Sequence, residues 1–270
     1  MFRYDFMINA FIVGILISIL CTSIGLFAVL KGYSMIGDTL AHGSLAGVAV
    51  GTLIGYNPLI TALIFSVSFG VIGETLRNYY KKYFELIMVI ILSLGTGIAL
   101  TIMSSGKLKT NINSFLFGSI LTVSIDEIVL VLILTILTIL IVFIFYDKLI
   151  YSTFDEDGAK IAGVNVKLVN YIYSILVAAA IAVNIKIVGV LVLSSMISLP
   201  TAAALQLKIS FKRTLIASFF FSFFNIISSL VLSYYLNLSP SGIIALMSVF
   251  TLIITILLRN IFLKDNLSLK

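Results

Sequence analysis

The sequence predicts an all-α polytopic membrane protein, and three observations support this fold class. Of its 270 residues, 61% are hydrophobic and only 10% are charged, whereas a soluble domain carries about 25% charged residues. Apolar runs of more than about 18 residues recur along the chain, and each is long enough to cross a bilayer core. These runs are continuous and do not alternate with polar residues, which argues against a β-barrel.

Nine apolar segments are predicted to span the membrane within a single domain, residues 1–270. Their approximate bounds are 7–30, 36–56, 58–76, 84–105, 124–147, 168–185, 187–207, 214–236 and 241–259. Pro58 favours a helix start because proline fits the first helical turn. Only residues 184–186 separate the sixth from the seventh segment, so a bent or re-entrant element and a total of eight spans also fit the sequence. Residues 106–123 are less apolar and are predicted to form a surface or re-entrant segment.

The basic residues predict the orientation of the chain. When the polar segment 148–167 is placed in the cytoplasm, all but four of the 17 Lys and Arg residues fall on the cytoplasmic side, as the positive-inside rule requires. The exceptions are Arg3, Lys107, Lys109 and Lys186. The N-terminus is then outside and the C-terminus inside. The net charge of +6 is explained by cytoplasmic loops rather than by nucleic-acid binding.

The second apolar segment carries Asp38 and His42, and His42 is the only histidine in the chain. Residues four apart on a helix share one face. Ionisable residues inside a membrane are costly and mark a functional site by default. Two interpretations fit this pattern: Asp38 caps the helix and His42 bonds one neighbour, or the two side chains bind a ligand together.

The chemistry of such a pair favours a divalent cation as the ligand. Imidazole and carboxylate groups bind Zn, Mn or Fe ions, and the single cysteine, Cys21, excludes a Cys-type zinc site within one chain. One Asp and one His make a weak site. A symmetric homodimer would supply four ligands, which fits the tetrahedral geometry of zinc. Weak binding suits transport because the cation must also leave, and no permanently bound cofactor is expected.

Small residues and one proline indicate how the helices pack. Gly43, Gly47, Gly51 and Gly55, here called the glycine ridge, recur every four residues on another face of the second segment. Small residues at this spacing let membrane helices approach closely, so the segment is predicted to lie centrally. Pro200 lacks an amide hydrogen and is expected to kink the seventh segment, either as part of a gate or as a simple bend.

Enzymatic motifs are missing from the sequence. A single histidine excludes the zinc-protease pattern H-E-x-x-H, and the chain contains no Walker A motif. Gly37-Asp38 and Tyr146-Asp147 resemble the paired aspartates of intramembrane proteases only superficially, because Met35 stands where the first glycine is expected. We therefore expect a transport protein and not an enzyme.

The longest polar stretch, residues 148–167, is predicted to contain a short cytoplasmic helix within about 151–166. Thr153 and Glu156 have the spacing of a capping box at its start. Gly163 is well placed to end it.

Two sets of side chains indicate what this short helix does. Three acidic residues load its first turn, where they favour the helix dipole, and three further residues share one side at helical spacing. The sets are Asp155, Glu156 and Asp157, and Phe154, Gly158 and Ile161. An acidic first turn is poorly suited to an anionic lipid surface. The helix is either a connector that lies on the membrane or a docking element for a cytoplasmic partner.

Several stretches resemble the membrane subunits of bacterial zinc and manganese ABC importers. They follow the order of that family and are 34–43 (SMIGDTLAHG), 115–120 (FLFGSI), 155–164 (DEDGAKIAGV), 188–192 (VGVLV), 199–203 (LPTAA) and 238–242 (LSPSG). The resemblance implies a homodimeric permease of the bacterial plasma membrane. It would receive Zn or Mn ions from an extracellular solute-binding protein and be driven by two cytoplasmic ATPase subunits. It assigns the metal pair to Asp38 and His42, and the ATPase-docking helix to the region from Phe154 to Val164.

Two transport hypotheses follow from the sequence, and a third possibility is a membrane scaffold that transports nothing. In the first, the chain is the permease subunit of an importer of zinc or manganese, and ATP hydrolysis takes place in a separate chain. In the alternative, the chain is a secondary metal transporter that needs no ATPase and couples to protons through Asp38 and His42.

Overall fold

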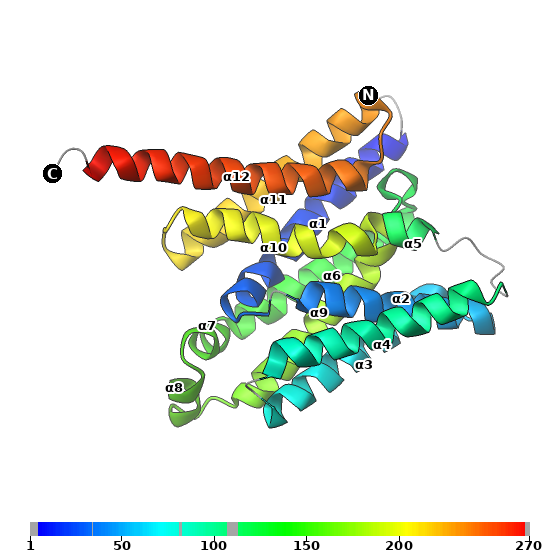
Figure 1. Cartoon of the computed structure of the whole chain (residues 1–270), viewed down its shortest axis with the longest axis horizontal. Coiled ribbons are helices and arrows are strands. Elements are labelled where there is room, and N and C mark those ends of the chain that lie inside the picture. The colour runs from blue at the N-terminus through cyan, green and yellow to red at the C-terminus, as the bar shows by residue number, and fades with distance from the viewer. Residues whose placement is uncertain (1–4, 34, 81–82, 107–112, 268–270) are drawn as a thin grey trace.

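The computed structural model describes residues 5–33, 35–80, 83–106 and 113–267, and within these residues the chain is helical and contains no strand. In chain order, the helices are α1 (Asp5–Leu30), α2 (Ile36–Ile54), α3 (Pro58–Tyr79), α4 (Phe84–Ser104), α5 (Asn113–Phe117), η2 (Ile120–Thr122), α6 (Ile125–Ile144), α7 (Tyr146–Phe154), α8 (Glu156–Ile161), α9 (Val166–Val188), α10 (Val190–Gln206), α11 (Phe211–Leu236) and α12 (Pro240–Leu267). Figure 1 shows them packed as one bundle. Pro58 is the first residue of α3, as predicted.

Seven of the described helices are long and apolar enough to cross a membrane, which confirms an all-α polytopic membrane protein. They are α1, α3, α4, α6, α9, α11 and α12. The apolar helix α10 has only 17 residues. The 19-residue α2 falls short in hydropathy rather than length, because it contains Asp38, His42 and four glycines.

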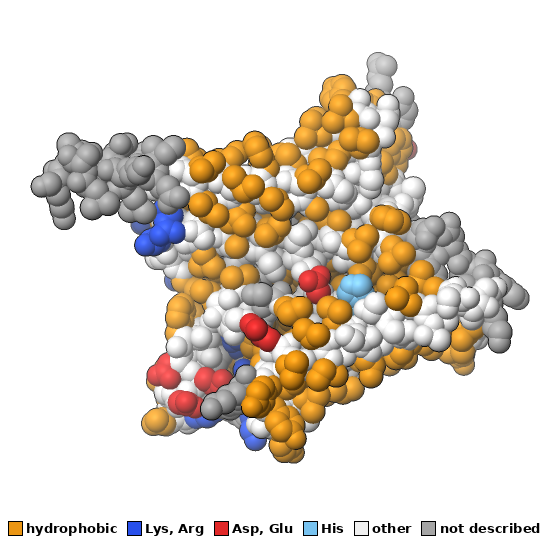
Figure 2. Space-filling view, in the orientation of Figure 1, with side chains coloured by type: hydrophobic (Ala, Val, Ile, Leu, Met, Phe, Trp, Pro, Cys, Tyr) orange, Lys and Arg blue, Asp and Glu red, His pale blue; other side chains and the backbone are white. Residues whose placement is uncertain are grey.

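The connections between the helices lie at two opposite ends of the bundle. In Figure 1 the α1–α2 turn, α7, α8 and the C-terminal end of α12 lie at one end, here called the α8 end. The start of α1 and α5 lie at the other, the α5 end. The Lys and Arg side chains visible in Figure 2 gather at the α8 end.

The break between the sixth and seventh predicted segments lies at Gly189, and its prediction at residues 184–186 is wrong. α9 continues to Val188, and Gly189 has a φ of +92°, which favours glycine. A side chain at Gly189 or at Gly118 would overlap the backbone of the other segment. The Ser119 amide also donates to two carbonyls in the last turn of α9, at 3.0 and 3.1 Å. A tertiary contact therefore sets this helix end.

The segment predicted to lie at the surface or to re-enter, 106–123, forms two short helices in its described part. α5 packs against α9 and α10, and η2 packs against α1 and α9, at the α5 end. Residues 107–112 lie outside the described residues, as do the basic residues Arg3, Lys81, Lys82 and Lys270 that entered the predicted orientation.

The fifth predicted segment, 124–147, is shorter in the structure because α6 ends at Ile144 and α7 follows directly. The start of α6 is fixed by a capping box that was not predicted from the sequence. The Glu127 amide donates to the Ser124 hydroxyl at 3.3 Å, and the Ser124 amide donates to the Glu127 carboxylate at 3.0 Å.

Candidate functional site

The first two turns of α2 carry the predicted metal pair. The residue before the helix, Met35, makes no side-chain capping bond, and the Ile36 amide donates to the Tyr33 carbonyl at 3.0 Å. Asp38 therefore lies inside the first turn and is not the N-cap, so the capping interpretation is wrong. Its carboxylate nevertheless lies at the positive end of the helix dipole. His42 follows one turn later.

The imidazole of His42 lacks a hydrogen-bond partner on one side. Its Nδ1 atom is shielded from solvent and has no partner among the described residues. A shielded polar atom of this kind costs free energy unless a ligand satisfies it. His42 and Asp38 are both half-buried. Figure 2 shows the single histidine of the chain at the surface of the molecule, beside an acidic side chain.

One chain supplies only part of a metal-binding site. Nowhere in the described residues do three or more His, Cys, Asp or Glu side chains gather so that they could hold a metal ion. At α2 the chain thus offers one carboxylate, from Asp38, and one imidazole, from His42. Because a zinc ion takes four ligands in most sites, a zinc ion bound here needs further ligands besides Asp38 and His42.

Close contacts pack α2 between four other helices. Three members of the glycine ridge face α3, where an added methyl group would overlap α3 atoms; they are Gly43, Gly47 and Gly51. Gly55 has a φ of +78° and ends α2 in the left-handed conformation. α4, α9 and α10 pack around the other sides of α2.

Pro200 is buried inside α10, which continues through it without a break. Because proline has no amide hydrogen, the Met196 carbonyl lacks its usual partner in the helix. This part of α10 lies tightly against α1, where an added methyl group at Gly25 would overlap the Ile197 carbonyl.

The predicted coupling helix consists of two helices that meet at Asp155. This residue is extended, with φ −147° and ψ 91°, and its carboxylate accepts a hydrogen bond from the Gly158 amide at 2.8 Å. Asp155 therefore caps α8, and the predicted cap Thr153 belongs to α7. Phe154 also belongs to α7, so the prediction that it shares a face of one helix with Gly158 and Ile161 is wrong.

Gly163 ends α8 as predicted, with a φ of +82°. Its amide donates to the Lys160 carbonyl at 3.0 Å, and the next amide, of Val164, donates to the Ala159 carbonyl at 2.9 Å. These are the two hydrogen bonds of a Schellman motif. The turn fixes how the chain returns from α8 to α9.

α7 and α8 expose two large apolar side chains at the α8 end. Phe154 is 65% exposed and Ile161 is 89% exposed, although both belong to helices too short to cross a membrane. Large exposed apolar side chains with polar residues around them are typical of protein interaction sites. The predicted coupling residues are here called the coupling segment: Phe154, Asp155, Glu156, Gly158, Ile161 and Gly163.

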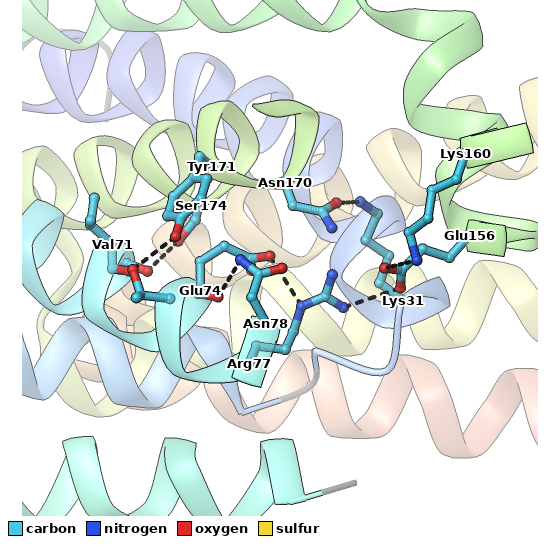
Figure 3. A network of polar contacts seen from close by, with 12 residues as sticks. Lys31, Val71, Glu74, Arg77, Asn78, Glu156, Lys160, Asn170, Tyr171 and Ser174 are labelled. Atoms are coloured by element: carbon cyan, nitrogen blue, oxygen red, sulfur yellow. Dashed lines mark hydrogen bonds and ion pairs between the residues drawn. The ribbon is translucent and has the colours of Figure 1, made fainter. Parts of the chain in front are cut away.

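An ionic network joins the coupling segment to the bundle (Figure 3). Arg77 Nη1 lies 3.6 Å from Glu156 Oε2, and Arg77 Nε lies 3.1 Å from Glu74 Oε1. Beside them, Lys31 Nζ donates to the Asn170 side chain at 2.6 Å. Burial, and to a lesser extent the charge of Arg77, lowers the pKa of Lys31 to about 8.

The link from this network to Glu156 was not predicted, because in the sequence Lys31 and Arg77 are simply positive charges of cytoplasmic loops. One signal was available: Glu74 and Arg77 have the i,i+3 spacing of a helical ion pair. No sequence signal indicated that the pair contacts Glu156, since more than 70 residues separate them in the chain.

Comparison with known proteins agrees with this architecture. The family model described as the ABC 3 transport family matches residues 3–259. The chain therefore belongs to the ABC 3 transport family, which confirms the resemblance noted in the sequence. Together with the seven apolar helices, this makes it a multi-pass protein of the bacterial inner membrane.

The relatives carry names of metal transport proteins. A probable metal transport system membrane protein of Treponema pallidum is 44% identical and aligns over 97% of this chain and 98% of its own length. The high-affinity zinc uptake system membrane protein ZnuB of Haemophilus influenzae is 25% identical, and the alignment covers 95% of this chain and 99% of that protein. The manganese transport system membrane protein MntC of Listeria monocytogenes is 26% identical, and the alignment covers 91% of this chain and 88% of that protein.

A solved structure shares the fold. It is PsaBC from Streptococcus pneumoniae in complex with Fab, which matches with a TM-score of 0.82 at 24% identity. The match covers 94% of this chain and 91% of that chain.

Proposed function

We propose that this chain is the transmembrane permease subunit of an ABC importer that moves zinc or manganese ions into the cytoplasm. The family and the names of its relatives support this function. The observation that carries it is the pair on α2. Asp38 and His42 lie half-buried on successive turns, and a shielded imidazole nitrogen lacks a partner among the described residues.

The proposed site binds its ion weakly and reversibly. The Asp38 carboxylate offsets part of the charge of a divalent cation, and the neutral His42 imidazole offers a nitrogen ligand. Because one chain provides two such donors, we infer a homodimer in which two copies of α2 complete one site. This assembly is supported by the half-burial of both side chains and by the lack of a third His, Cys, Asp or Glu beside them among the described residues. The ion is cargo, and no resident cofactor is part of the proposal.

We infer nine crossings, with the N-terminus outside and the C-terminus inside. The seven apolar helices are joined by α2 and α10, which lie in the same bundle. The gathering of visible Lys and Arg side chains at the α8 end supports a cytoplasmic position for that end. The whole chain then forms one permease domain.

The proposed partners act at opposite ends of the bundle. The coupling segment, with its exposed Phe154 and Ile161, is the proposed docking element for a cytoplasmic ATPase, in which ATP hydrolysis takes place. An extracellular solute-binding protein delivers the ion at the α5 end. Transport follows alternating access, in which the partners shift the population between two states of the site.

The site is tested by metal uptake in cells that depend on this importer. We expect Asp38→Ala and His42→Ala to reduce uptake of Zn and Mn to the background of cells without the chain. Asp126→Ala is the matched control, because it removes an exposed carboxylate at the start of α6. Wild-type uptake in both α2 variants, at normal expression, would contradict the assignment.

The secondary-transporter alternative is tested by reconstitution. The chain alone, in liposomes with an imposed ion gradient, should show no metal flux. Flux in the absence of the ATPase subunits would exclude the importer mechanism and favour the alternative.

A further inference from the structure

Arg77 contacts four elements at the α8 end of the bundle. It lies in the last turn of α3, where its guanidinium bonds Glu74, and it reaches Glu156 on α8 (Figure 3). Its guanidinium carbon also lies 5.1 Å from the ring centre of Tyr33 in the α1–α2 turn. On the remaining side, it lies 5.9 Å from the ring centre of Phe84, the first residue of α4.

The charges of this cluster are largely removed from water. The side chains of Glu74 and Arg77 are 2% and 12% exposed, and that of Glu156 is 29% exposed. Ionic interactions are stronger in such surroundings than at a wet surface. Removing one member leaves an uncompensated charge in the protein. Arg77 is thus paired with Glu74 on its own helix and also reaches Glu156 on α8.

Tyr33 connects Arg77 to the helix that carries the metal pair. Tyr33 is buried, and its ring packs against that of Phe84 with a centroid distance of 4.6 Å. Its carbonyl accepts the hydrogen bond of the Ile36 amide at the start of α2. Because close-packed groups transmit displacement, a shift of Tyr33 moves the first turn of α2, which contains Asp38.

A polar cavity of about 120 Å³ lies between the coupling segment and the α1–α2 turn. Its lining includes Lys31, Tyr33, Arg77, Thr153, Glu156 and Asn170. The volume is enough for several water molecules, so α8 has room to move relative to the turn. Across this space, the Arg77–Glu156 ion pair joins the two sides.

We propose that Arg77 is a positioning residue that transmits movement of α8 to the metal-bearing start of α2. This proposal rests on the proposed function, in which an ATPase displaces the coupling segment. Glu156 moves with α8, and Arg77 follows because it is bonded to that carboxylate. Its contact with Tyr33 then shifts the first turn of α2. A planar guanidinium suits this role because it can bond two carboxylates and stack on a ring at once.

The proposal is tested on the reconstituted complex of the chain with its ATPase and binding protein. The measured quantity is the number of zinc or manganese ions taken up per ATP hydrolysed. In Arg77→Gln and in Glu156→Gln, we expect ATP hydrolysis to continue while metal uptake per ATP falls by about 5- to 150-fold. This fold-change corresponds to the usual range of the coupling free energy between two sites. The double variant should be no worse than either single variant, because both remove the same link.

Lys160→Gln is the matched control. The Lys160 ammonium lies 3.2 Å from the same Glu156 carboxylate, but it belongs to α8 itself. This variant should keep the wild-type uptake per ATP. An equal loss in Lys160→Gln would show that Glu156 acts within α8 and would overturn the proposal.

Four other outcomes are distinct. Unchanged uptake per ATP in Arg77→Gln, or losses that multiply in the double variant, overturn the role of Arg77. If Arg77→Gln fails to fold because Glu74 is left unpaired, Glu74→Gln/Arg77→Gln removes both charges of α3 and carries the same test. Failure of the wild-type complex to take up metal with ATP overturns the proposed function instead.

Discussion

Gly95 of α4 lies directly against the backbone of His42 on α2. A Cβ atom at Gly95 would stand 3.0 Å from the His42 carbonyl carbon and 3.1 Å from its oxygen. The close approach therefore depends on the missing side chain, and it occurs at the residue that carries the proposed nitrogen ligand.

Gly95→Val is expected to separate α4 from α2 and to reduce metal uptake. Overpacking of this kind destabilises a protein by about 1–3 kcal/mol, so the unfolding temperature in detergent should fall as well. Gly97→Val is the matched control on the same helix, because nothing lies within 4 Å of the added Cβ. Similar behaviour of the two variants would show that the contact with His42 is unimportant.

Ile161→Asp is expected to abolish copurification of the ATPase subunits and leave the fold of the chain intact. The side chain is 89% exposed on α8, so a charge there disturbs a partner contact but not the core. The measurement is the amount of ATPase recovered with the tagged chain. Ile209→Asp, at an exposed apolar residue of the α10–α11 turn, is the comparison. Full recovery with Ile161→Asp would argue against docking at α8.

Lys31 is expected to make the free energy of unfolding change with pH in the alkaline range. Its pKa is lowered from 10.5 to about 8, first by burial and then by the charge of Arg77. Between these values the unfolded chain binds the proton more readily, so stability should rise as the pH increases from about 8 towards 10.5. Below pH 8 Lys31 is charged in both states, so the free-energy cost of burying its charge is fully present and does not change with pH.

The measurement is the unfolding temperature of the wild type minus that of Lys31→Met, as a function of pH. The subtraction removes the titration of other groups, and the charged neighbours Glu74, Arg77 and Glu156 are common to both proteins. A difference that stays flat from pH 8 to 10 would show that Lys31 titrates normally.

Zinc or manganese should stabilise the wild-type protein against heat. A ligand that binds only the folded state adds about 2.7 kcal/mol when present at about 100 times its Kd. Asp38→Ala and His42→Ala should lose this stabilisation, and chelation of the ion should reverse it in the wild type. An equal thermal shift in both variants would place the binding site elsewhere.

Local chemistry was sufficient to predict several features of this chain. The long apolar runs predicted the membrane helices, Pro58 the start of α3, and Gly163 the end of α8. The spacing of Asp38 and His42 predicted that both lie on one helix, and both belong to α2. In each case, the physical cause acts within a few residues of the sequence.

Features that depend on tertiary contacts could not be predicted. The break after α9 lies at Gly189 and not at the predicted residues 184–186, because the chain there meets Gly118, more than 70 residues away. Thr153 and Asp155 are both competent helix caps, and only the extended backbone at Asp155 decides between them. Arg77 resembles any other basic residue at a helix end until Glu156 is seen beside it.

The low hydropathy of α2 has a consequence for how the protein is made. The translocon sorts segments by their own hydrophobicity, and polar and charged residues lower the tendency of a segment to insert into the membrane. α2 carries Asp38, His42 and four glycines, so it is a poor membrane segment by itself. Its tight turn into α3 and its glycine contacts with that helix favour insertion of the two as a hairpin. The polar residues proposed to serve transport thereby make the biogenesis of α2 dependent on its neighbour.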